Sequence, residues 1–326
     1  MKILVTGGAG FIGSHFVRQL LTDAYPAFEG AEVTVLDRLT YSGNRANLDP
    51  VAGSRRLRFL TGDICDPAAA DEATAGRELV VHFAAESHVD RSIASAEPFV
   101  RANLVGTQVL LDAALRHRVS RFVHVSTDEV YGSIDIGSWR EDQPVAPRSP
   151  YSASKAGSDL LALSYHHTHG LPALVTRCSN NYGPYQYPEK VIPLFITNLL
   201  DGRPVPLYGD GGNVRDWLHV DDHCTGIALA AQRGQPGELY HIGGGVELTN
   251  KELTGHLLDA CGAGWDMVRH VDDRKGHDRR YSLDTTKACS ELGYRPRTAF
   301  PDGLAATVRW YHDHRRWWEP LRSLTQ

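Results

Sequence analysis

Short, mainly apolar runs alternate with amphipathic segments through the first 178 residues. Runs with the length and the Val/Ile/Leu content of buried strands occupy residues 2–6, 32–36, 57–60, 79–83, 121–125 and 174–177. Between them, apolar residues recur at helical spacing, most clearly at residues 14–22, 98–117 and 150–169. This alternation predicts an α/β fold with a Rossmann-type, doubly wound parallel sheet.

The pattern changes after residue 178. Residues 179–216 are rich in Asn, Gly, Pro and Tyr, which indicates loops around one helix at residues 191–200. Strand and helix patterns return within residues 217–249, and mixed helices and loops follow. We therefore predict two interleaved domains. Residues 1–178 with part of 217–249 form the Rossmann domain, and residues 179–216 and 250–326 form a smaller substrate domain.

A glycine-rich turn follows the first strand and precedes the first helix. Gly7, Gly10 and Gly13 have the spacing of the dinucleotide fingerprint. In that fingerprint the glycines close the turn, let the backbone approach a pyrophosphate and allow the helix to pack on its strand. An ordinary glycine-rich turn is the alternative, and the order strand, turn, helix favours the fingerprint.

Acidic residues end the second and third strands. The carboxylate of Asp37 is suited to bind both ribose hydroxyls and to repel a 2′-phosphate, which favours NAD over NADP. Arg38 follows at once and could soften that preference. Asp63 either contacts the adenine or caps the turn after it, and the sequence leaves both alternatives open.

Composition narrows the class of protein. The 326 residues are 42% apolar and 22% charged, so we expect a sizeable core rather than disorder. A net charge of −5 gives no reason to expect nucleic acid or an anionic membrane as partner. No apolar run approaches the roughly 20 residues that span a bilayer, and residues 1–6 do not resemble a signal peptide.

The five cysteines are widely spaced and odd in number, without a C-x-x-C pair. We expect reduced thiols and a cytoplasmic protein. His166, His167 and His169 lack a supporting carboxylate cluster, so no metal site is predicted there. The tryptophans near the end of the chain are expected to be packing residues; they are Trp310, Trp317 and Trp318.

The segment from Ser126 to Lys155 holds a set of groups for proton abstraction. Tyr151 and Lys155 lie one turn apart on a predicted helix, and Thr127 ends a predicted strand. A free phenol has a pKa of roughly 10, so Tyr151 acts as a base only if cations stabilise its phenolate. Lys155 supplies one positive charge and an oxidised nicotinamide another, which suits the oxidation of an alcohol.

Asp128 and Glu129 are not needed by a simple alcohol dehydrogenase. Next to a ketone, one carboxylate can remove a C–H proton while a carboxylic acid protonates a leaving hydroxyl, which is a dehydration. Neighbouring residues of a strand point to opposite faces, so the chain must leave strand geometry by Asp128. Solvated acids of a turn are the alternative.

These motifs together resemble a known family. The sequence is similar to the extended short-chain dehydrogenase/reductases, and among them to the dTDP-glucose 4,6-dehydratase family, over essentially its whole length. The resemblance is carried by residues 6–13, 37–41, 84–92, 126–132, 151–155, 178–184, 215–218 and 276–280. The Asp128-Glu129 pair is its most specific part, because related epimerases and decarboxylases usually carry other residues there.

The resemblance implies a role for each catalytic residue. Tyr151, helped by Lys155 and Thr127, oxidises C4 of the glucose while NAD takes the hydride. Glu129 then removes the C5 proton and Asp128 protonates the departing C6 hydroxyl. The hydride returns at C6 and C5 is reprotonated, which gives dTDP-4-dehydro-6-deoxy-glucose, an intermediate of deoxysugar biosynthesis.

The resemblance also implies the binding sets. We assign to the NAD site Gly7, Gly10, Phe11, Ile12, Gly13, Asp37, Arg38, Leu39, Thr40, Asp63, Ile64, Phe83, Ala84, Ala85, Ser87, Ala102, Tyr151, Lys155 and Asn181. Ala102 stands where the family often has threonine. We assign to the dTDP-glucose site Ser87, Thr127, Asn180, Lys190, Val191, Pro206, Leu207, Tyr208, Arg215, Asn250, Asp273, Arg274, Lys275, Gly276 and His277.

Arg215 is suited to a diphosphate because its planar fork binds two oxygens at once. An ion pair with Asp216 or another acid is the alternative, and Arg279 is a second diphosphate candidate. The resemblance further implies a homodimer, in which the helices at 98–117 and 150–169 form a four-helix bundle with a second copy.

Two other functions remain as alternatives. One is another sugar-nucleotide enzyme of this fold, a 4-epimerase or a UDP-sugar decarboxylase, and the Asp128-Glu129 pair disfavours it. The other is a non-catalytic dinucleotide-sensing protein. Such a protein has no need of the complete set of Thr127, Asp128, Glu129, Tyr151 and Lys155.

Overall fold

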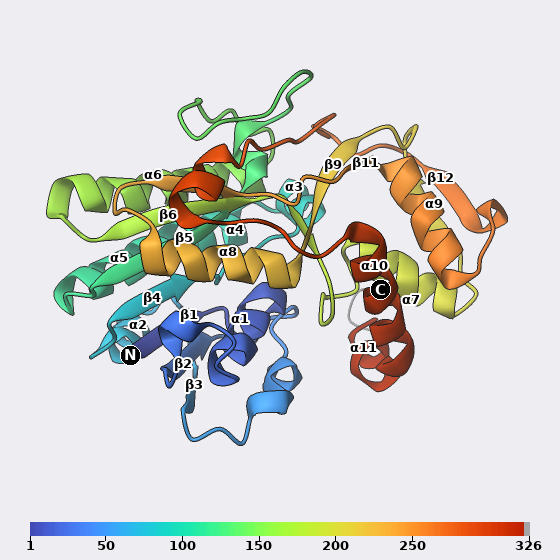
Figure 1. Ribbon diagram of the computed structural model, residues 1–326. Helices are drawn as coiled ribbons and strands as arrows, with labels where there is room; N and C mark the ends of the chain where they lie inside the picture. Colours follow the sequence, from blue (N-terminus) through green and yellow to red (C-terminus); the bar gives the residue numbers. More distant parts are fainter. Residues whose placement is uncertain (323–326) are drawn as a thin grey trace.

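A parallel sheet of seven strands forms the larger part of the computed structural model, which describes residues 1–322 (Figure 1). The strand order is β10-β6-β5-β4-β1-β2-β3, and every neighbouring pair is parallel. The strands are β1 (Lys2–Thr6), β2 (Glu32–Asp37), β3 (Leu57–Thr61), β4 (Leu79–His82), β5 (Arg121–Thr127), β6 (Ala173–Cys178) and β10 (Leu239–Ile242). The strand order reverses at β1, so a crevice is expected at the carboxyl ends of β1 and β4.

Helices cover both faces of this sheet. They are α1 (Phe11–Leu21), α2 (Pro67–Thr74), α3 (Val89–Ala94), α4 (Glu97–Phe99), α5 (Gly106–Arg116), α6 (Pro150–His169) and α8 (Val220–Arg233), and a wider helical turn at Val100–Val105 joins α4 to α5. Apolar residues of α1 and α8 pack on one face, and those of α2, α5 and α6 pack on the other. The predicted doubly wound Rossmann-type fold is confirmed.

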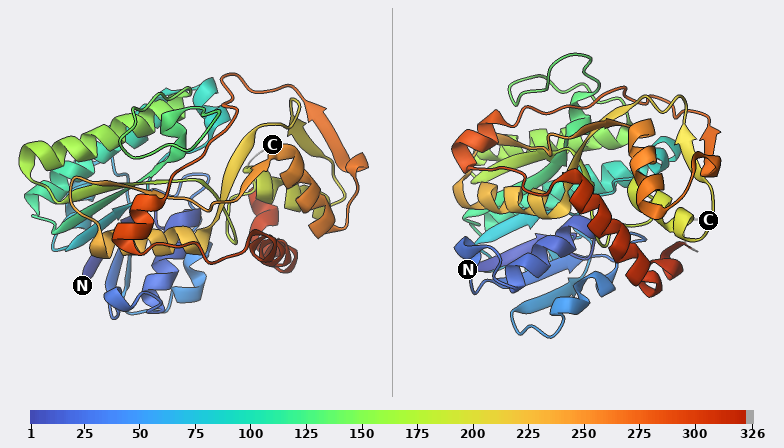
Figure 2. Two further views of the ribbon diagram at one scale, coloured as in Figure 1. Left: turned by 45° about the horizontal axis from the view of Figure 1, so that its top comes forward. Right: turned by 45° about the vertical axis from the view of Figure 1, so that its right-hand side comes forward.

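A second lobe lies beside the carboxyl edge of the sheet (Figure 2). Its elements are β7 (Asn180–Tyr182), β8 (Val205–Tyr208), β9 (Val214–His219), β11 (Glu247–Thr249), β12 (Val268–Val271), α7 (Val191–Leu200), α9 (Asn250–Cys261), α10 (Phe300–Asp313) and α11 (Arg315–Arg322). Ile196, Leu253, Leu304 and Trp318 are buried in its separate core. The division of the chain into two interleaved domains stays a prediction.

The prediction for residues 179–216 was correct for α7 but missed β7, β8 and the first half of β9, whose second half lies where strand patterns were predicted. β7, β8 and β9 are only three to six residues long, too short for a periodic pattern. Pro206 indicated a turn, yet it lies in β8, which pairs with β12 in a two-stranded sheet. Proline is tolerated in such an edge strand because one side of the strand forms no ladder.

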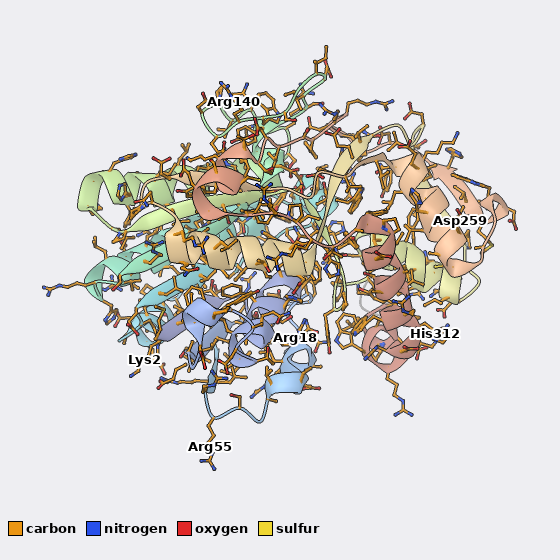
Figure 3. All side chains as sticks on the ribbon, in the orientation of Figure 1. Lys2, Arg18, Arg55, Arg140, Asp259 and His312 are labelled. Carbon is orange, nitrogen blue, oxygen red and sulfur yellow. The ribbon has the colours of Figure 1, made fainter. Side chains whose placement is uncertain are left out.

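Charged groups lie mainly at the surface, as expected for a chain with a sizeable apolar core. Charged side chains such as Arg55, Arg140 and Asp259 lie at the periphery (Figure 3). All five cysteines lie within residues 1–322 and are free thiols, as predicted. Over the same residues, the structure contains no helix with the length and apolar character to cross a membrane.

One ion pair is buried between α6 and β6. Arg177 Nε donates to Asp159 Oδ2 at 2.9 Å, and the side chains are 4% and 0% exposed. The His124 ring lies 3.3 Å from the other Asp159 oxygen, and the Arg177 guanidinium stacks on Tyr131 at 4.5 Å. Because α6 also carries Tyr151 and Lys155, this pair fixes the helix with the predicted catalytic residues to the sheet.

We predict that Asp159→Asn lowers the free energy of unfolding by about 3 kcal/mol, because it leaves the Arg177 charge buried without its partner. Asp71→Asn is the matched control, since Asp71 pairs with Arg116 at the surface and should cost less than about 1 kcal/mol. Urea unfolding of both variants measures the difference. Equal losses would contradict the importance of the buried pair.

Candidate active site

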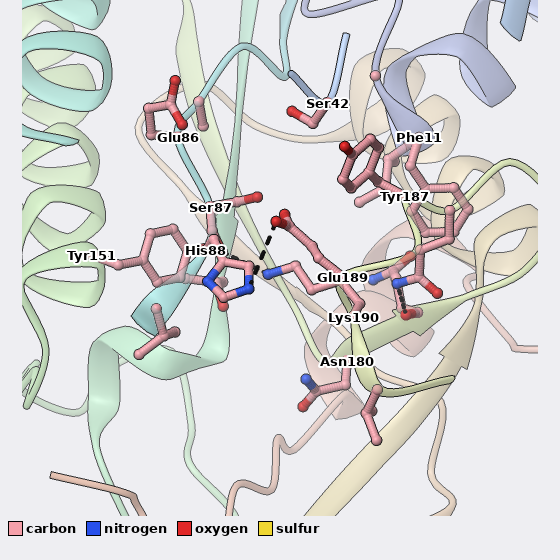
Figure 4. Close-up of a pocket in the computed structure, with 18 of the residues that line it drawn as sticks. Phe11, Ser42, Glu86, Ser87, His88, Tyr151, Asn180, Tyr187, Glu189 and Lys190 are labelled. Carbon is pink, nitrogen blue, oxygen red and sulfur yellow. Dashed lines mark hydrogen bonds and ion pairs between the residues drawn. The ribbon is translucent and has the colours of Figure 1, made fainter. Parts of the chain in front are cut away.

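A cavity of about 920 Å³ opens at the carboxyl ends of the parallel strands, between the two lobes. Its walls include the glycine turn, the ends of β2, β4 and β5, the start of α6, and segments of the second lobe. In the close-up of Figure 4, Ser87, His88, Tyr151, Asn180 and Lys190 surround one space. The cavity lies where an open α/β sheet is expected to bind its ligand.

The glycine turn of this cavity accepts only glycine at two positions. Gly7 has φ +68°, and a Cβ there would lie 2.6 Å from the Ala84 nitrogen. A Cβ at Gly13 would lie 2.3 Å from the Gly7 oxygen. Gly10 immediately precedes α1, whose first residues line the cavity, so free N–H groups of a helix N-terminus are available to a diphosphate.

Asp37 and Arg38 are both engaged by protein groups. The Asp37 carboxylate accepts the N–H groups of Ala9 and Leu39 at 2.9 and 2.8 Å. Arg38 donates to Glu86 at 2.6 Å and to Asp63 at 3.2 Å. Because two acids hold this guanidinium, it is poorly available to a 2′-phosphate, and the geometry favours NAD.

Asp63 caps the turn that follows it, which is one of the two roles that the sequence allowed. Its Oδ1 accepts the N–H of Cys65 at 2.9 Å, while Oδ2 accepts from Arg38. Asp63 also lines the cavity, so the contact with an adenine stays a prediction.

Tyr151 and Lys155 extend from α6 toward the end of β5. The helix begins with a capping box of Ser149 and Ser152, which fixes its first turn. Lys155 Nζ donates to the Val125 oxygen at 2.8 Å, and burial lowers the pKa of Lys155 to about 8. Burial, followed by the Glu129 charge, raises the pKa of Tyr151 well above its usual value. Tyr151 therefore needs cationic help to act as a base.

The chain leaves strand geometry immediately after Thr127. A helical turn at Asp128–Tyr131 follows β5, so both acidic side chains reach the cavity. Thr127 Oγ1 donates to Asp128 Oδ1 at 3.2 Å and accepts the Glu129 N–H at 3.3 Å. The difficulty of two adjacent acids on one strand is thereby removed.

The two carboxyls have different surroundings. Burial, and then the neighbouring Glu129, raises the pKa of Asp128 well above its ordinary value, and Asp128 Oδ2 is buried without a hydrogen-bond partner. Burial also raises the pKa of Glu129, but three cations of the second lobe oppose that rise: Lys190, Arg215 and Arg274. Burial thus favours the neutral form of both carboxyls, and more cations oppose that effect at Glu129 than at Asp128.

Arg215 is held in place by the second lobe. Its guanidinium donates to the backbone carbonyl oxygen of Asp278 at 2.9 Å and lies 4.2 Å from the centre of the Tyr281 ring. The Asp216 carboxylate accepts instead the N–H groups of Gly244 and Val246. The alternative Arg215–Asp216 ion pair is therefore absent from the described structure.

Most of the predicted site residues line this one cavity. All five predicted catalytic residues do so, as do all predicted cofactor residues except Leu39 and all predicted substrate residues except Leu207, Asp273 and Lys275. Leu207 is buried in the small sheet, at 2% exposure, and Asp273 accepts from His277 at 2.6 Å. Arg279 pairs with exposed Asp210 at 2.9 Å and does not line the cavity.

Several lining residues were not predicted. Glu189 accepts the Tyr41 hydroxyl at 3.0 Å and lies 3.7 Å from the His88 ring nitrogen (Figure 4). Glu86, Asp278 and Tyr281 also line the cavity. The signal for Glu86, Asp278 and Tyr281 is that each stands within or beside a motif, and the signal for Glu189 is its position next to Lys190. Within residues 1–322, no group of three or more His, Cys, Asp and Glu side chains is arranged to hold a metal.

Comparisons with known proteins agree with this geometry. The family model described as GDP-mannose 4,6 dehydratase matches residues 4–307. A dTDP-glucose 4,6-dehydratase of Streptomyces niveus is 65% identical over 323 residues, covering 99% of this chain and 96% of that protein.

Solved structures give the same result. The structure of DesIV, a dTDP-glucose 4,6-dehydratase from Streptomyces venezuelae with NAD and TYD bound, is 65% identical, with a TM-score of 0.97 over 98% of this chain and 100% of that chain. A Thermus thermophilus UDP-glucose 4-epimerase in complex with NAD is 33% identical, with a TM-score of 0.88 over 96% of this chain and 100% of that chain. This chain belongs to the GDP-mannose 4,6 dehydratase family and, within it, to the dTDP-glucose 4,6-dehydratases.

Proposed function

We propose that the chain converts dTDP-glucose to dTDP-4-dehydro-6-deoxy-glucose, with NAD as its cofactor, in deoxysugar biosynthesis. One observation carries this proposal: Asp128 and Glu129 are adjacent and both face the cavity that holds Thr127, Tyr151 and Lys155. The redox groups and the elimination groups therefore act on one sugar.

The glycine turn and Asp37 fit the cofactor. Added side chains at Gly7 or Gly13 would occupy the space needed by the turn, and the Asp37 oxygens face the same cavity. When bound, NAD supplies a hydride acceptor for C4 and returns that hydride at C6. The positive charge of the nicotinamide and that of Lys155 favour the phenolate of Tyr151.

The chain's own groups move the protons. Tyr151 accepts the proton of the C4 hydroxyl, and Thr127 shares the hydrogen bond of that hydroxyl. Glu129 then removes the C5 proton, which the C4 ketone has made acidic. Asp128 gives its proton to the C6 hydroxyl, which leaves as water. Reprotonation of C5 completes the reaction.

The rival functions use less of this site. A 4-epimerase needs oxidation and reduction at C4 but no acid for a leaving hydroxyl, so buried Asp128 would have no task. A dinucleotide sensor would need neither acid. The raised pKa of Asp128, caused first by burial, supports the dehydratase.

The second lobe supports a nucleotide diphosphate as the part of the substrate that is bound and kept through the reaction. Arg215, Lys190 and Arg274 bring three positive charges to the cavity of a chain whose net charge is −5. We propose Arg215 as the principal diphosphate ligand. The preference for thymine over uracil follows only from the relatives and is part of the proposal.

We further propose a cytoplasmic homodimer. The helical segments at the predicted bundle expose apolar side chains, with Val100 at 45%, Val105 at 44% and Leu160 at 58% exposure. A second copy would cover these residues in a four-helix bundle. The five free thiols support a reducing compartment.

Turnover of dTDP-glucose in heavy water, without added NAD, tests the reaction. We expect a 4-keto-6-deoxy product that carries solvent deuterium at C5 and the original C4 hydrogen at C6. Nuclear magnetic resonance of the product reads both positions. A 4-epimer, a pentose product, or no turnover even after addition of NAD would sink the proposal.

Glu129→Gln should reduce product formation by about a hundredfold or more, because the amide cannot remove the C5 proton. Oxidation at C4 should remain possible, and it is read as absorbance of the reduced nicotinamide in a single turnover. Product formation at the wild-type rate would refute the role of Glu129.

Leu160→Glu should shift the protein from dimer to monomer, because a charge would be buried in the proposed bundle. Ile136→Glu is the matched control, since Ile136 is 91% exposed on a distant loop. Sedimentation of both variants measures the oligomeric state. A wild-type monomer, or a Leu160→Glu dimer of unchanged affinity, would contradict the bundle.

A further inference from the structure

The C-terminal helices of the second lobe contact the cofactor half of the molecule. Trp310 and Trp317 pack with Tyr185, whose ring centroid lies 4.5 and 5.5 Å from theirs. Trp318 is fully buried, as expected of a packing residue. Trp317 also makes a polar contact that packing alone does not require.

The indole Nε1 of Trp317 donates to Asn47 Oδ1 at 2.9 Å. Asn47 belongs to the helical turn Arg45–Val51 after β2 and is only 1% exposed. Its amide Nδ2 donates in turn to the Ala9 oxygen at 2.8 Å. An indole nitrogen can only donate, so this contact sets the amide orientation that directs the Asn47 donor at Ala9.

Ala9 lies in the glycine turn between Gly7 and Gly10, and its peptide groups are bonded on both sides. Its oxygen also accepts the Asn44 N–H at 3.0 Å, and its N–H donates to Asp37 Oδ2 at 2.9 Å. The bonds therefore run without interruption from Trp317, through Asn47 and Ala9, to the carboxylate assigned to the ribose.

A second connection runs beside the first. Arg18 of α1 donates to the backbone carbonyl oxygen of Asn47 at 2.6 Å. Its guanidinium lies 4.2 Å from the centre of the Tyr185 ring. Figure 3 shows Arg18 between α1 and the C-terminal helices. Asn47 is thus held from both lobes at the back of the glycine turn.

We propose that Trp317 is a positioning residue for the dinucleotide, acting through Asn47 on the glycine turn and Asp37. The proposal rests on the proposed use of NAD and deepens it. It assigns the C-terminal helix a part in cofactor retention, although that helix lies outside the nucleotide-binding sequence motif. Loss of the indole N–H frees the Asn47 amide to rotate and removes the support behind Ala9.

Trp317→Phe tests this proposal, because it keeps an aromatic ring beside Tyr185 and deletes the donor. Trp310→Phe is the matched control from the same aromatic cluster. The release rate of bound NAD is measured by rapid gel filtration of enzyme loaded with labelled NAD. We expect Trp317→Phe to release NAD about fivefold faster, the effect of one buried hydrogen bond, and Trp310→Phe to match the wild type.

Two further measurements separate positioning from general destabilisation. At saturating NAD, the KM for dTDP-glucose should not change in Trp317→Phe. In the background of Asn47→Leu, which already breaks the connection, Trp317→Phe should add no further increase in NAD release.

The inference is overturned if Trp317→Phe releases NAD at the wild-type rate, if Trp310→Phe releases it equally fast, or if the two losses add in the double variant. With a wild-type enzyme that binds NAD and turns over, these outcomes leave the proposed function intact. A wild type that binds no NAD would overturn both.

Discussion

The burial of two adjacent carboxyl groups at the end of β5 is the constraint on which the site depends. Burial disfavours the charged form of each carboxyl and two adjacent like charges repel, so the pair favours retention of one proton. Burial and then Glu129 raise the pKa of Asp128 well above its ordinary value, whereas burial raises the pKa of Glu129 against the opposing charges of Lys190, Arg215 and Arg274. In the proposed mechanism, this difference lets consecutive residues serve as an acid and a base.

The two lobes contribute unequally to the surroundings that set the pKa values of Asp128 and Glu129. The Rossmann half places Thr127, Asp128 and Glu129 on β5 and the turn after it, and the buried Asp159–Arg177 pair holds α6 beside them. The cations that oppose the rise in the pKa of Glu129 come from the second lobe, and Lys190 and Arg274 act on Glu129 while Arg215 acts on both carboxyls. In the proposed mechanism, the Rossmann half carries the redox groups, and the second lobe adds the positive charges that surround the elimination pair.

Local chemistry explains what the sequence could predict. Gly7 and Gly13 are fixed by close backbone contacts, and the apolar runs of the parallel strands are fixed by burial on both faces. The positive φ of Gly7 and the contact of Gly13 with the Gly7 oxygen arise within the turn itself, and an apolar run is visible in the sequence whichever helices cover it. The sequence therefore predicted the sheet, the glycine turn and the chemical groups of the catalytic set.

Long-range contacts explain what the sequence could not predict. The ties of Arg38 to Glu86 and Asp63 join three separate segments, and Arg279 turns to Asp210 rather than to the cavity. Tyr281 lines the cavity with its ring against the guanidinium of Arg215, which lies 66 positions earlier in the sequence. The sequence required the chain to leave strand geometry at Asp128 if both acids were to reach one substrate, but it did not show how. The structure has a helical turn at Asp128–Tyr131.

The protonation states of the two adjacent carboxyls test the central claim most directly. Carbon-13 labelling of Asp and Glu side-chain carboxyls, with signals assigned through Asp128→Asn and Glu129→Gln, would report both states in the NAD-loaded enzyme. The account predicts a protonated Asp128 at neutral pH and a Glu129 that ionises at lower pH than Asp128. An ionised Asp128 beside a protonated Glu129 would contradict it.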